Sequence, residues 1–202
     1  NESLRLKELA AKHRERGREI VVVMGVGFVG AVMAGVVADS VDSNGNSTKF
    51  VIGMQRPSTR SYWKIPFLNR GIAPVEAEDP EVAPMIKRCV LDKETLTATF
   101  SYDALSLADI VVVDVQCDYQ KEALGDVKQG HAAIGALEES LKVIGENVDP
   151  GCLVLIETTV PPGTTEYVAY PIMKKAFENR GLNDVEPLLA HSFERVMPGR
   201  NY

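Results

Sequence analysis

Residues 18–35, REIVVVMGVGFVGAVMAG, place three glycines within six positions directly after a valine-rich run. The run at 19–24 is short and almost wholly apolar, which is typical of a strand buried on both faces of a sheet. Small apolar residues resume after the glycines and predict a helix over 28–39. The stretch therefore predicts a buried strand, a tight turn and a helix.

The turn itself, GVGFVG at 25–30, has the spacing of a dinucleotide-binding fingerprint. In that interpretation Gly25 permits the tight turn, Gly27 lets the backbone approach a pyrophosphate, and Gly30 lets the helix pack closely on the strand. The helix N-terminus adds free N–H groups and a positive dipole end, both of which attract phosphate. A glycine-rich turn that serves packing alone is the alternative.

Strands and helices alternate along the rest of the chain. Apolar or β-branched runs predict further strands at 50–54, 95–100, 109–116, 152–160 and 186–192. Helical patterns lie at 3–16, 60–69, from 79 onward, at 101–108, at 131–147 and from the 161–163 turn to Gly181. This alternation predicts an α/β fold, a doubly wound parallel six-stranded Rossmann-type sheet with strand order 3-2-1-4-5-6 and helices on both faces. We divide the chain into an N-terminal amphipathic helix at 1–17 and a dinucleotide-binding Rossmann domain at 18–202.

Composition excludes several classes of function. The net charge of −6 argues against a nucleic-acid partner held by general basic attraction. No apolar run approaches the ~20 residues of a membrane span, and no secretory signal is visible. Three cysteines without CxxC spacing and three histidines indicate reduced thiols and no metal site. We therefore expect a cytoplasmic protein without a metal, a membrane or a nucleic acid as partner.

Candidate ligand contacts follow the strands, because a doubly wound sheet binds its ligand at the carboxyl ends of strands 1 and 4. Gln55 stands where NAD enzymes usually place an acidic ribose ligand. Its amide can bond a ribose hydroxyl but lacks the charge that repels a 2′-phosphate, and Arg56 can pair with such a phosphate. A solvated Gln-Arg pair at a strand end is the alternative.

Further polar residues follow the fourth, fifth and sixth strands. Gln116 and Cys117 follow the fourth strand, and Cys117 has no base nearby in sequence, so packing or cofactor lining is favoured over catalysis. In ETTVPPGTTE, Glu157 ends an apolar run, and the hydroxyls of Thr158 and Thr159 face the nicotinamide end of a cofactor that spans the crevice. A capped strand-to-helix turn is the alternative there. Glu194, after the last strand, is equally well a surface charge.

Together these stretches resemble the N-terminal half of the UDP-glucose/GDP-mannose dehydrogenase family, the nucleotide-sugar 6-dehydrogenases. The matching motifs, in the family's order over residues 20–200, are GVGFVG, LNRG with PVEAEDPEV, LADIVVVDV, ETTVPPGTTE and SFERVMPG. The ending ERVMPG is closer to the branch that oxidises UDP-N-acetylhexosamines. Two other hypotheses stay open: a 6-phosphogluconate or 3-hydroxyacid type dehydrogenase, which the TTVPPGT turn argues against, and a stand-alone dinucleotide-binding module without catalysis.

The resemblance implies oxidation of the C6 alcohol of a UDP-sugar to a carboxylate in two NAD-dependent steps. A cysteine in the family's C-terminal half captures the aldehyde, a second hydride transfer gives a thioester, and water hydrolyses it. Thr159 matches the threonine that helps to hold this water and Glu194 matches the acid that acts with it, so these two are the catalytic candidates. The cofactor-binding candidates are Gly25, Gly27, Phe28, Val29, Gly30, Gln55, Arg56, Arg60, Val115, Gln116 and Thr158.

The resemblance also implies NAD rather than NADP as cofactor, a nucleotide-sugar substrate and a homodimer for the full-length protein. Two features depart from the family pattern. Phe193 stands where the family usually has proline, and the chain stops at Tyr202. The family's supporting lysine and asparagine, its dimer-forming central helix and its C-terminal domain with the nucleophilic cysteine would all follow. We therefore expect this chain to be a fragment that is inactive on its own.

Overall fold

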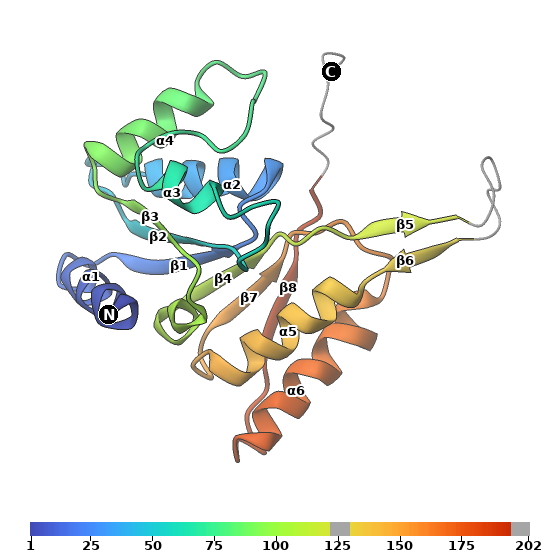
Figure 1. The fold of residues 1–202 in the computed structure, drawn as a ribbon. Helices are drawn as coiled ribbons and strands as arrows, with labels where there is room; N and C mark the ends of the chain where they lie inside the picture. The colour runs from blue at the N-terminus through green and yellow to red at the C-terminus, as the bar shows by residue number, and fades with distance from the viewer. Residues whose placement is uncertain (122–129, 195–202) are drawn as a thin grey trace.

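The computed structural model describes residues 1–121 and 130–194. Its centre is a six-stranded sheet with the order β3-β2-β1-β4-β7-β8 (Figure 1). The strands are β1 (Glu19–Met24), β2 (Lys49–Met54), β3 (Leu96–Thr99), β4 (Ile110–Val113), β7 (Leu153–Ile156) and β8 (Leu188–His191). All neighbouring pairs are parallel. Counted within the sheet, this is the order 3-2-1-4-5-6, so the predicted Rossmann-type α/β fold is confirmed.

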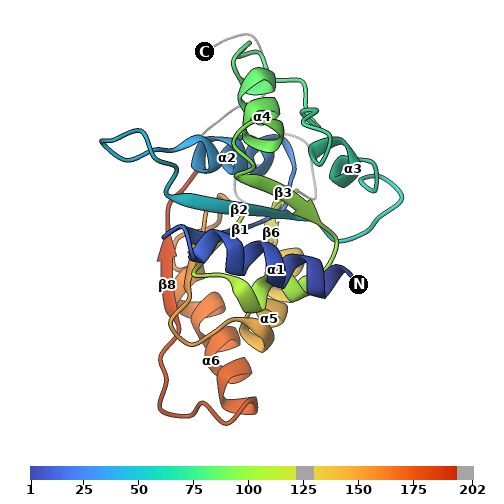
Figure 2. The same cartoon turned by 90° about the vertical axis from the view of Figure 1, so that its left-hand side faces the viewer.

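Helices cover both faces of the sheet, and each face has its own cluster of buried apolar residues (Figures 1 and 2). On one face lie α2 (Phe28–Asp39), α3 (Lys64–Leu68) and α4 (Val82–Leu91). On the other lie α1 (Glu2–Arg14), the 3₁₀-helix η1 (Tyr102–Leu107), α5 (Gly135–Asn147) and α6 (Tyr170–Asn179), which continues the π-helical turn η2 (Thr165–Ala169). The connections between strands therefore lie on one face of the sheet from β1 to β3 and on the other face from β4 onward.

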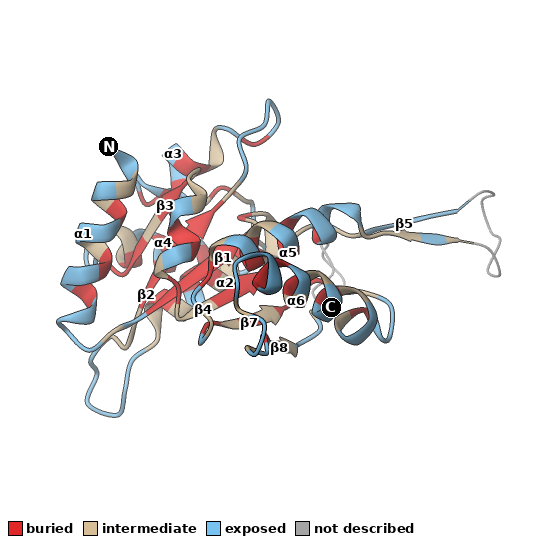
Figure 3. Ribbon diagram, turned by 90° about the horizontal axis from the view of Figure 1, so that it is seen from below, coloured by how far each residue is buried: buried red, intermediate tan, exposed pale blue. Residues whose placement is uncertain are grey.

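The strand residues alternate between the two clusters. Val21 and Val23 pack with α2 and α4, whereas Ile20 and Val22 pack on the side of α5. Figure 3 shows β1, β2 and β4 at the buried centre of the molecule, with the exposed surfaces on the outer sides of the helices. Burial on both faces explains the unbroken apolar sequence of β1.

The N-terminal helix α1 packs on the sheet, and Figure 2 shows it in front of β1. Leu6 and Ala10 are 0% and 1% exposed within the same apolar cluster as α5. Burial of two such side chains contributes roughly 2–4 kcal/mol to stability. His13, near the end of the helix, stacks on Phe50 of β2 with 3.9 Å between the ring centroids.

The segment 131–147 was predicted as one helix, and its first part is a strand. His131–Ala133 form β6, which pairs antiparallel with β5 (Asp118–Gln120), and α5 begins only at Gly135. The pair projects from the body as an arm (Figure 1). Its pairing joins residues that are distant in sequence, so no local periodicity indicates it.

Several elements are shorter than their sequence patterns. β4 and β7 end at Val113 and Ile156, so Asp114 and Glu157 are the first residues beyond these strands. The predicted helix at 60–69 is reduced to α3, and α4 begins at Val82. Within the two described ranges, no helix combines the length and apolar character needed to cross a bilayer. The RVMPG part of the last motif, and the end of the predicted domain at 202, lie outside those ranges.

Candidate functional site

The turn between β1 and α2 packs tightly against the end of β4. Gly25 has a φ of +104°, and a Cβ atom there would lie 2.0 Å from the carbonyl oxygen of Asp114. A Cβ atom on Gly30 would lie 1.9 Å from the carbonyl oxygen of Gly25. Glycine is therefore required at both positions, because in each case the obstructing atom belongs to the backbone.

Gly27 has a different environment. No atom lies within 4 Å of the position that its Cβ would take. It is the N-cap of α2 and provides no side-chain cap, and the next two residues, Phe28 and Val29, are only half-buried. The space beside Gly27 is therefore open, and it lies at a helix N-terminus, where an anionic group is favoured. A pyrophosphate contact at Gly27 stays a prediction.

Gln55, the predicted ribose contact, holds the glycine turn in place. Its Oε1 accepts a hydrogen bond of 3.0 Å from the N–H of Val26, and its Nε2 donates to Ser61 Oγ at 3.4 Å. The side chain thus joins the end of β2 to the turn after β1. A contact between Gln55 and ribose stays a prediction.

The two arginines that follow β2 are exposed. Arg56 Nη1 lies 3.2 Å from Glu139 Oε2 of α5, which leaves further guanidinium donors for a ligand. Arg60 is fixed through its backbone carbonyl, which accepts a bond of 3.1 Å from Trp63 Nε1. Their contacts with a cofactor stay predictions.

Thr158 braces the ends of β4 and β7 against each other. Its hydroxyl accepts a hydrogen bond of 3.1 Å from the N–H of Val115 and donates one of 2.8 Å to the carbonyl of the same residue. Gln116, the next residue, donates from Nε2 to Asp118 Oδ1 at 2.8 Å. Cofactor contacts of these three residues stay predictions; what the described contacts provide is a fixed backbone at the carboxyl end of β4.

The two catalytic candidates lie side by side. Thr159 Oγ1 donates a hydrogen bond of 2.7 Å to the backbone carbonyl of Glu194. This bond ties the turn after β7 to the loop after β8. It brings the two residues to the edge of the sheet where the glycine turn lies, while their catalytic roles stay predictions.

Two further carboxyl groups, which sequence reasoning did not include among the site residues, belong to the same edge. Asp114 has its pKa raised to about 6 by burial and by the charge of Glu194, against a hydrogen bond from the Gly30 N–H that lowers it. Glu157 has its pKa raised to about 7 by burial and then by Asp114 and Glu194. Burial also raises the pKa of Glu194. The available signal was an acidic residue at the end of each apolar run.

None of the three cysteines has the properties of a nucleophile. Burial raises the pKa of Cys89 to about 11 and that of Cys152 to about 12. Cys117 is partly exposed, and its pKa is raised by burial and by Asp118. A thiol with a raised pKa is a poor source of thiolate.

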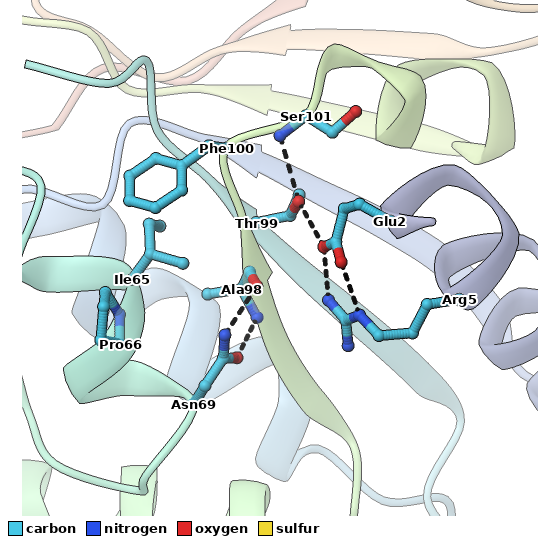
Figure 4. Close-up of a pocket in the computed structure, with 9 residues that line it drawn as sticks. All are labelled: Glu2, Arg5, Ile65, Pro66, Asn69, Ala98, Thr99, Phe100 and Ser101. Carbon is cyan, nitrogen blue, oxygen red and sulfur yellow. Dashed lines mark hydrogen bonds and ion pairs between the residues drawn. The ribbon is translucent and has the colours of Figure 1, made fainter.

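A separate pocket of ≈ 580 Å³ lies beside the edge strand β3, between α1 and α3 (Figure 4). Its polar side chains bond one another and the strand. Asn69 accepts from the Ala98 N–H at 2.7 Å and donates to the Ala98 carbonyl at 2.9 Å. Glu2 bonds Arg5 and accepts from Thr99 Oγ1 at 2.7 Å. These contacts give the pocket wall a structural role in covering the edge of the sheet.

Comparison with known proteins agrees with this geometry. The profile of the UDP-glucose/GDP-mannose dehydrogenase family, NAD binding domain, matches residues 19–202. The UDP-N-acetyl-D-mannosamine dehydrogenase of Pyrococcus horikoshii is 31% identical over 182 residues, which are 89% of this chain and 37% of that protein.

Two solved structures are similar as well. The NDP-N-acetyl-D-galactosaminuronic acid dehydrogenase of Methanosarcina mazei Go1 superposes with a TM-score of 0.74 at 32% identity, over 95% of this chain and 37% of that one. The UDP-D-ManNAc dehydrogenase of Pyrococcus horikoshii gives a TM-score of 0.65 at 30% identity, over 90% of this chain and 37% of that one. The chain thus spans little more than a third of the length of these relatives. With its glycine turn and its sheet order, it belongs to the UDP-glucose/GDP-mannose dehydrogenase family and represents the family's NAD-binding domain.

Proposed function

We propose that this chain supplies the NAD site of a nucleotide-sugar 6-dehydrogenase, which oxidises the C6 alcohol of a UDP-sugar, a UDP-N-acetylhexosamine, to a carboxylate in two steps. The observation that carries the proposal is the open space at Gly27 in front of the N-terminus of α2. The names of the relatives from Pyrococcus and Methanosarcina support an N-acetylated sugar as substrate. The homodimer implied by the family resemblance and a cytoplasmic location are part of the same proposal.

The residues present fit the proposed cofactor. Gly27, Phe28 and Val29 would hold the pyrophosphate through backbone N–H groups, and Gln55 lies on the adenosine side. When bound, NAD accepts the hydride that leaves C6 of the sugar. Thr159 and Glu194 would hold and deprotonate the water that ends the second step, because a water attack needs a fixed acceptor and a nearby base.

The loop after β2 bears on the choice between NAD and NADP. Gln55 has no charge that would repel a 2′-phosphate, and Arg56 is exposed beside it. We propose NAD as the cofactor with a loosened preference: loss of a carboxylate at an exposed site changes the discrimination by about 1 kcal/mol. An affinity for NAD more than about a hundredfold above that for NADP, or ~2.7 kcal/mol, would show that the preference is not loosened.

The proposal is tested by titration calorimetry of the 202-residue chain with NAD and NADP, and by assays of the complete protein with UDP-N-acetylhexosamines and UDP-glucose. We expect the chain to bind NAD without producing NADH from any sugar, and the complete protein to form two NADH per sugar. Binding of NAD without oxidation by the complete protein would favour the alternative of a non-catalytic dinucleotide-binding module. Absence of binding would contradict the proposal itself.

A further inference from the structure

The register of the sheet places three backbone positions in a row at its carboxyl edge. The Asp114 N–H donates to the Met24 carbonyl at 2.9 Å, and the Glu157 N–H donates to the Val113 carbonyl at 2.9 Å. Gly25, Asp114 and Glu157 therefore lie across β1, β4 and β7 in the order in which the crevice crosses the sheet. The row runs from the proposed pyrophosphate position toward β7.

The side chains of Asp114 and Glu157 lie on the face of the sheet that carries α2. Asp114 Oδ2 would be 2.7 Å from a Cβ atom on Gly30, which places it directly beside α2. Leu155, two residues before Glu157, packs on the apolar cluster of that same face, and residues two apart in a strand share a face. In addition, the charge of Asp114 acts on Glu157.

Glu157 is incompletely bonded in this position. The residue is only 7% exposed, and within residues 1–121 and 130–194 its Oε2 has no hydrogen-bond partner. A buried polar atom without a partner is rare in native structures, because the lost hydration is not replaced. The observation therefore points to a donor outside the described residues.

The described neighbours of Glu157 cannot donate a hydrogen bond to its Oε2 while they are charged. Asp114 and Glu194 are carboxyl groups that only accept when ionised, and the hydroxyl of Thr158 already donates to the Val115 carbonyl. In the described part of the chain, no three acidic, histidine or cysteine residues are grouped to hold a metal ion. The missing partner is thus best matched by an N–H or O–H donor on a bound molecule.

A dinucleotide bound at Gly27 reaches this position with its nicotinamide end, because the adenosine half lies on the side of β2. The donor on the nicotinamide ring is the N–H₂ of its carboxamide. We propose that Glu157 Oε2 accepts a hydrogen bond from this carboxamide and so fixes the rotation of the nicotinamide ring. The inference rests on the proposed function, since it requires the dinucleotide at the glycine turn.

The raised pKa of Glu157 is compatible with an N–H donor as its partner. The charged groups that face it are Asp114 from β4 and Glu194 from the loop after β8, whereas the turn at 25–30 and the first turn of α2 contain no titratable side chain. Burial and these two charges raise the pKa of Glu157 to about 7. A bonded N–H group stabilises the ionised form, so binding lowers the pKa and releases a fraction of a proton near pH 7.

The test compares three ligands by titration calorimetry on the 202-residue chain: NAD, 3-acetylpyridine adenine dinucleotide and ADP-ribose. The acetylpyridine analogue keeps the carbonyl on the ring but has a methyl group in place of N–H₂, and ADP-ribose lacks the ring. We expect wild type to bind NAD about tenfold more tightly than the analogue. Other donors, such as ribose hydroxyls, are common to both dinucleotides and give no such difference.

Three variants assign the difference to Glu157. Glu157→Met keeps the side-chain volume without an acceptor, and we expect its NAD-to-analogue ratio to fall to about one while its ADP-ribose affinity is unchanged. Glu157→Gln keeps an acceptor oxygen and retains most of the ratio. Glu146→Met, on the exposed side of α5, is the matched control and behaves as wild type.

The outcomes separate the inference from the proposed function. Equal affinity of wild type for NAD and the analogue overturns the inference, as does a Glu157→Met ratio equal to that of wild type. Titrations in two buffers of different ionisation enthalpy give a second readout, in which proton release on NAD binding disappears in Glu157→Met. If neither NAD nor ADP-ribose binds to wild type, the proposed function fails together with the inference.

Discussion

Thr159 donates a hydrogen bond of 2.7 Å from its hydroxyl to the backbone carbonyl of Glu194. The bond links the first turn after β7 to the loop that leaves β8, and it restrains the backbone at the residue that we propose as the base. A base that is fixed in this way needs little reorganisation when it acts, which favours proton transfer.

Replacement of Glu194 by glutamine tests its role in the complete protein. The change removes the base and leaves the backbone carbonyl that Thr159 bonds. We expect a rapid early phase of NADH formation, followed by turnover that is slower by about 10²-fold or more, with sugar retained on the enzyme. Stopped-flow absorbance measures the phases of NADH formation, and intact-protein mass spectrometry measures the sugar retained on the enzyme. Glu178→Gln on the outer side of α6 is the control, and normal steady turnover of Glu194→Gln would remove Glu194 from the mechanism.

Gly27 and Gly30 of the turn are expected to respond differently to substitution. Gly27→Val places its side chain in open space, so the chain should unfold at the same urea concentration as wild type and lose NAD binding. Gly30→Ala brings a Cβ to 1.9 Å from the Gly25 carbonyl and should destabilise the fold itself. Urea unfolding combined with NAD titration separates the effects. A Gly27→Val variant that binds NAD like wild type would contradict the assignment of the pyrophosphate position.

The side chain of Asn69 bonds the edge of the sheet as a neighbouring strand would, since it bonds both the N–H and the carbonyl of Ala98. Asn69→Ala leaves these two groups without that partner, and we expect a loss of about 1–3 kcal/mol in the free energy of unfolding. Asn179→Ala, at the exposed end of α6, is the control and should lie within about 0.5 kcal/mol of wild type. Equal unfolding midpoints for the two variants would show that the Asn69 contact contributes nothing.

Stability should depend on pH through Glu157. Its pKa rises from 4.5 to about 7 on folding, so the native state holds its proton more strongly, and this contribution is complete below pH 4.5 and lost as the pH rises through 7. Glu157→Gln does not titrate. We therefore expect its free energy of unfolding to gain roughly 2–3 kcal/mol relative to wild type between pH 5 and pH 8.

The difference between the two proteins is the quantity to measure, because His13 titrates in the opposite sense. Burial lowers the pKa of His13 from 6.5 to about 4, so stability is lost from this group as the pH falls below 6.5. Wild type and Glu157→Gln share His13, and its effect cancels in the difference. Parallel stability curves for the two proteins from pH 5 to pH 8 would contradict the raised pKa of Glu157.

The fold was predictable because its signals are local. Each strand of the main sheet lies in a short apolar or β-branched run. The glycine spacing at 25–30 marks the switch from strand to helix, and the alternation of elements leaves few topologies for a parallel sheet. The topology in turn predicts that residues after different strands meet at one edge. This is why Thr159 and Glu194 could be placed together from the sequence.

What the sequence did not indicate depends on contacts between distant residues. The pairing of β5 with β6 joins two segments that have no alternating apolar pattern, so His131–Ala133 were assigned to a helix. The side chain of Gln55 bonds the turn after β1, a contact set by the register of β1 and β2. The burial of Glu157 and the lack of a partner for its Oε2 likewise depend on how β1, β4 and β7 pack together, and not on the residues next to Glu157 in sequence.

The cover over β3 has a consequence for how copies of this domain can associate. At that edge Asn69 occupies the hydrogen-bonding groups of Ala98, and Glu2 of α1 adds a bond to Thr99, whereas in the described part of the chain no strand pairs with the outer side of β8. Edge-to-edge pairing of copies through β3 is therefore disfavoured, because the backbone groups of Ala98 that a strand of another copy would bond are already taken.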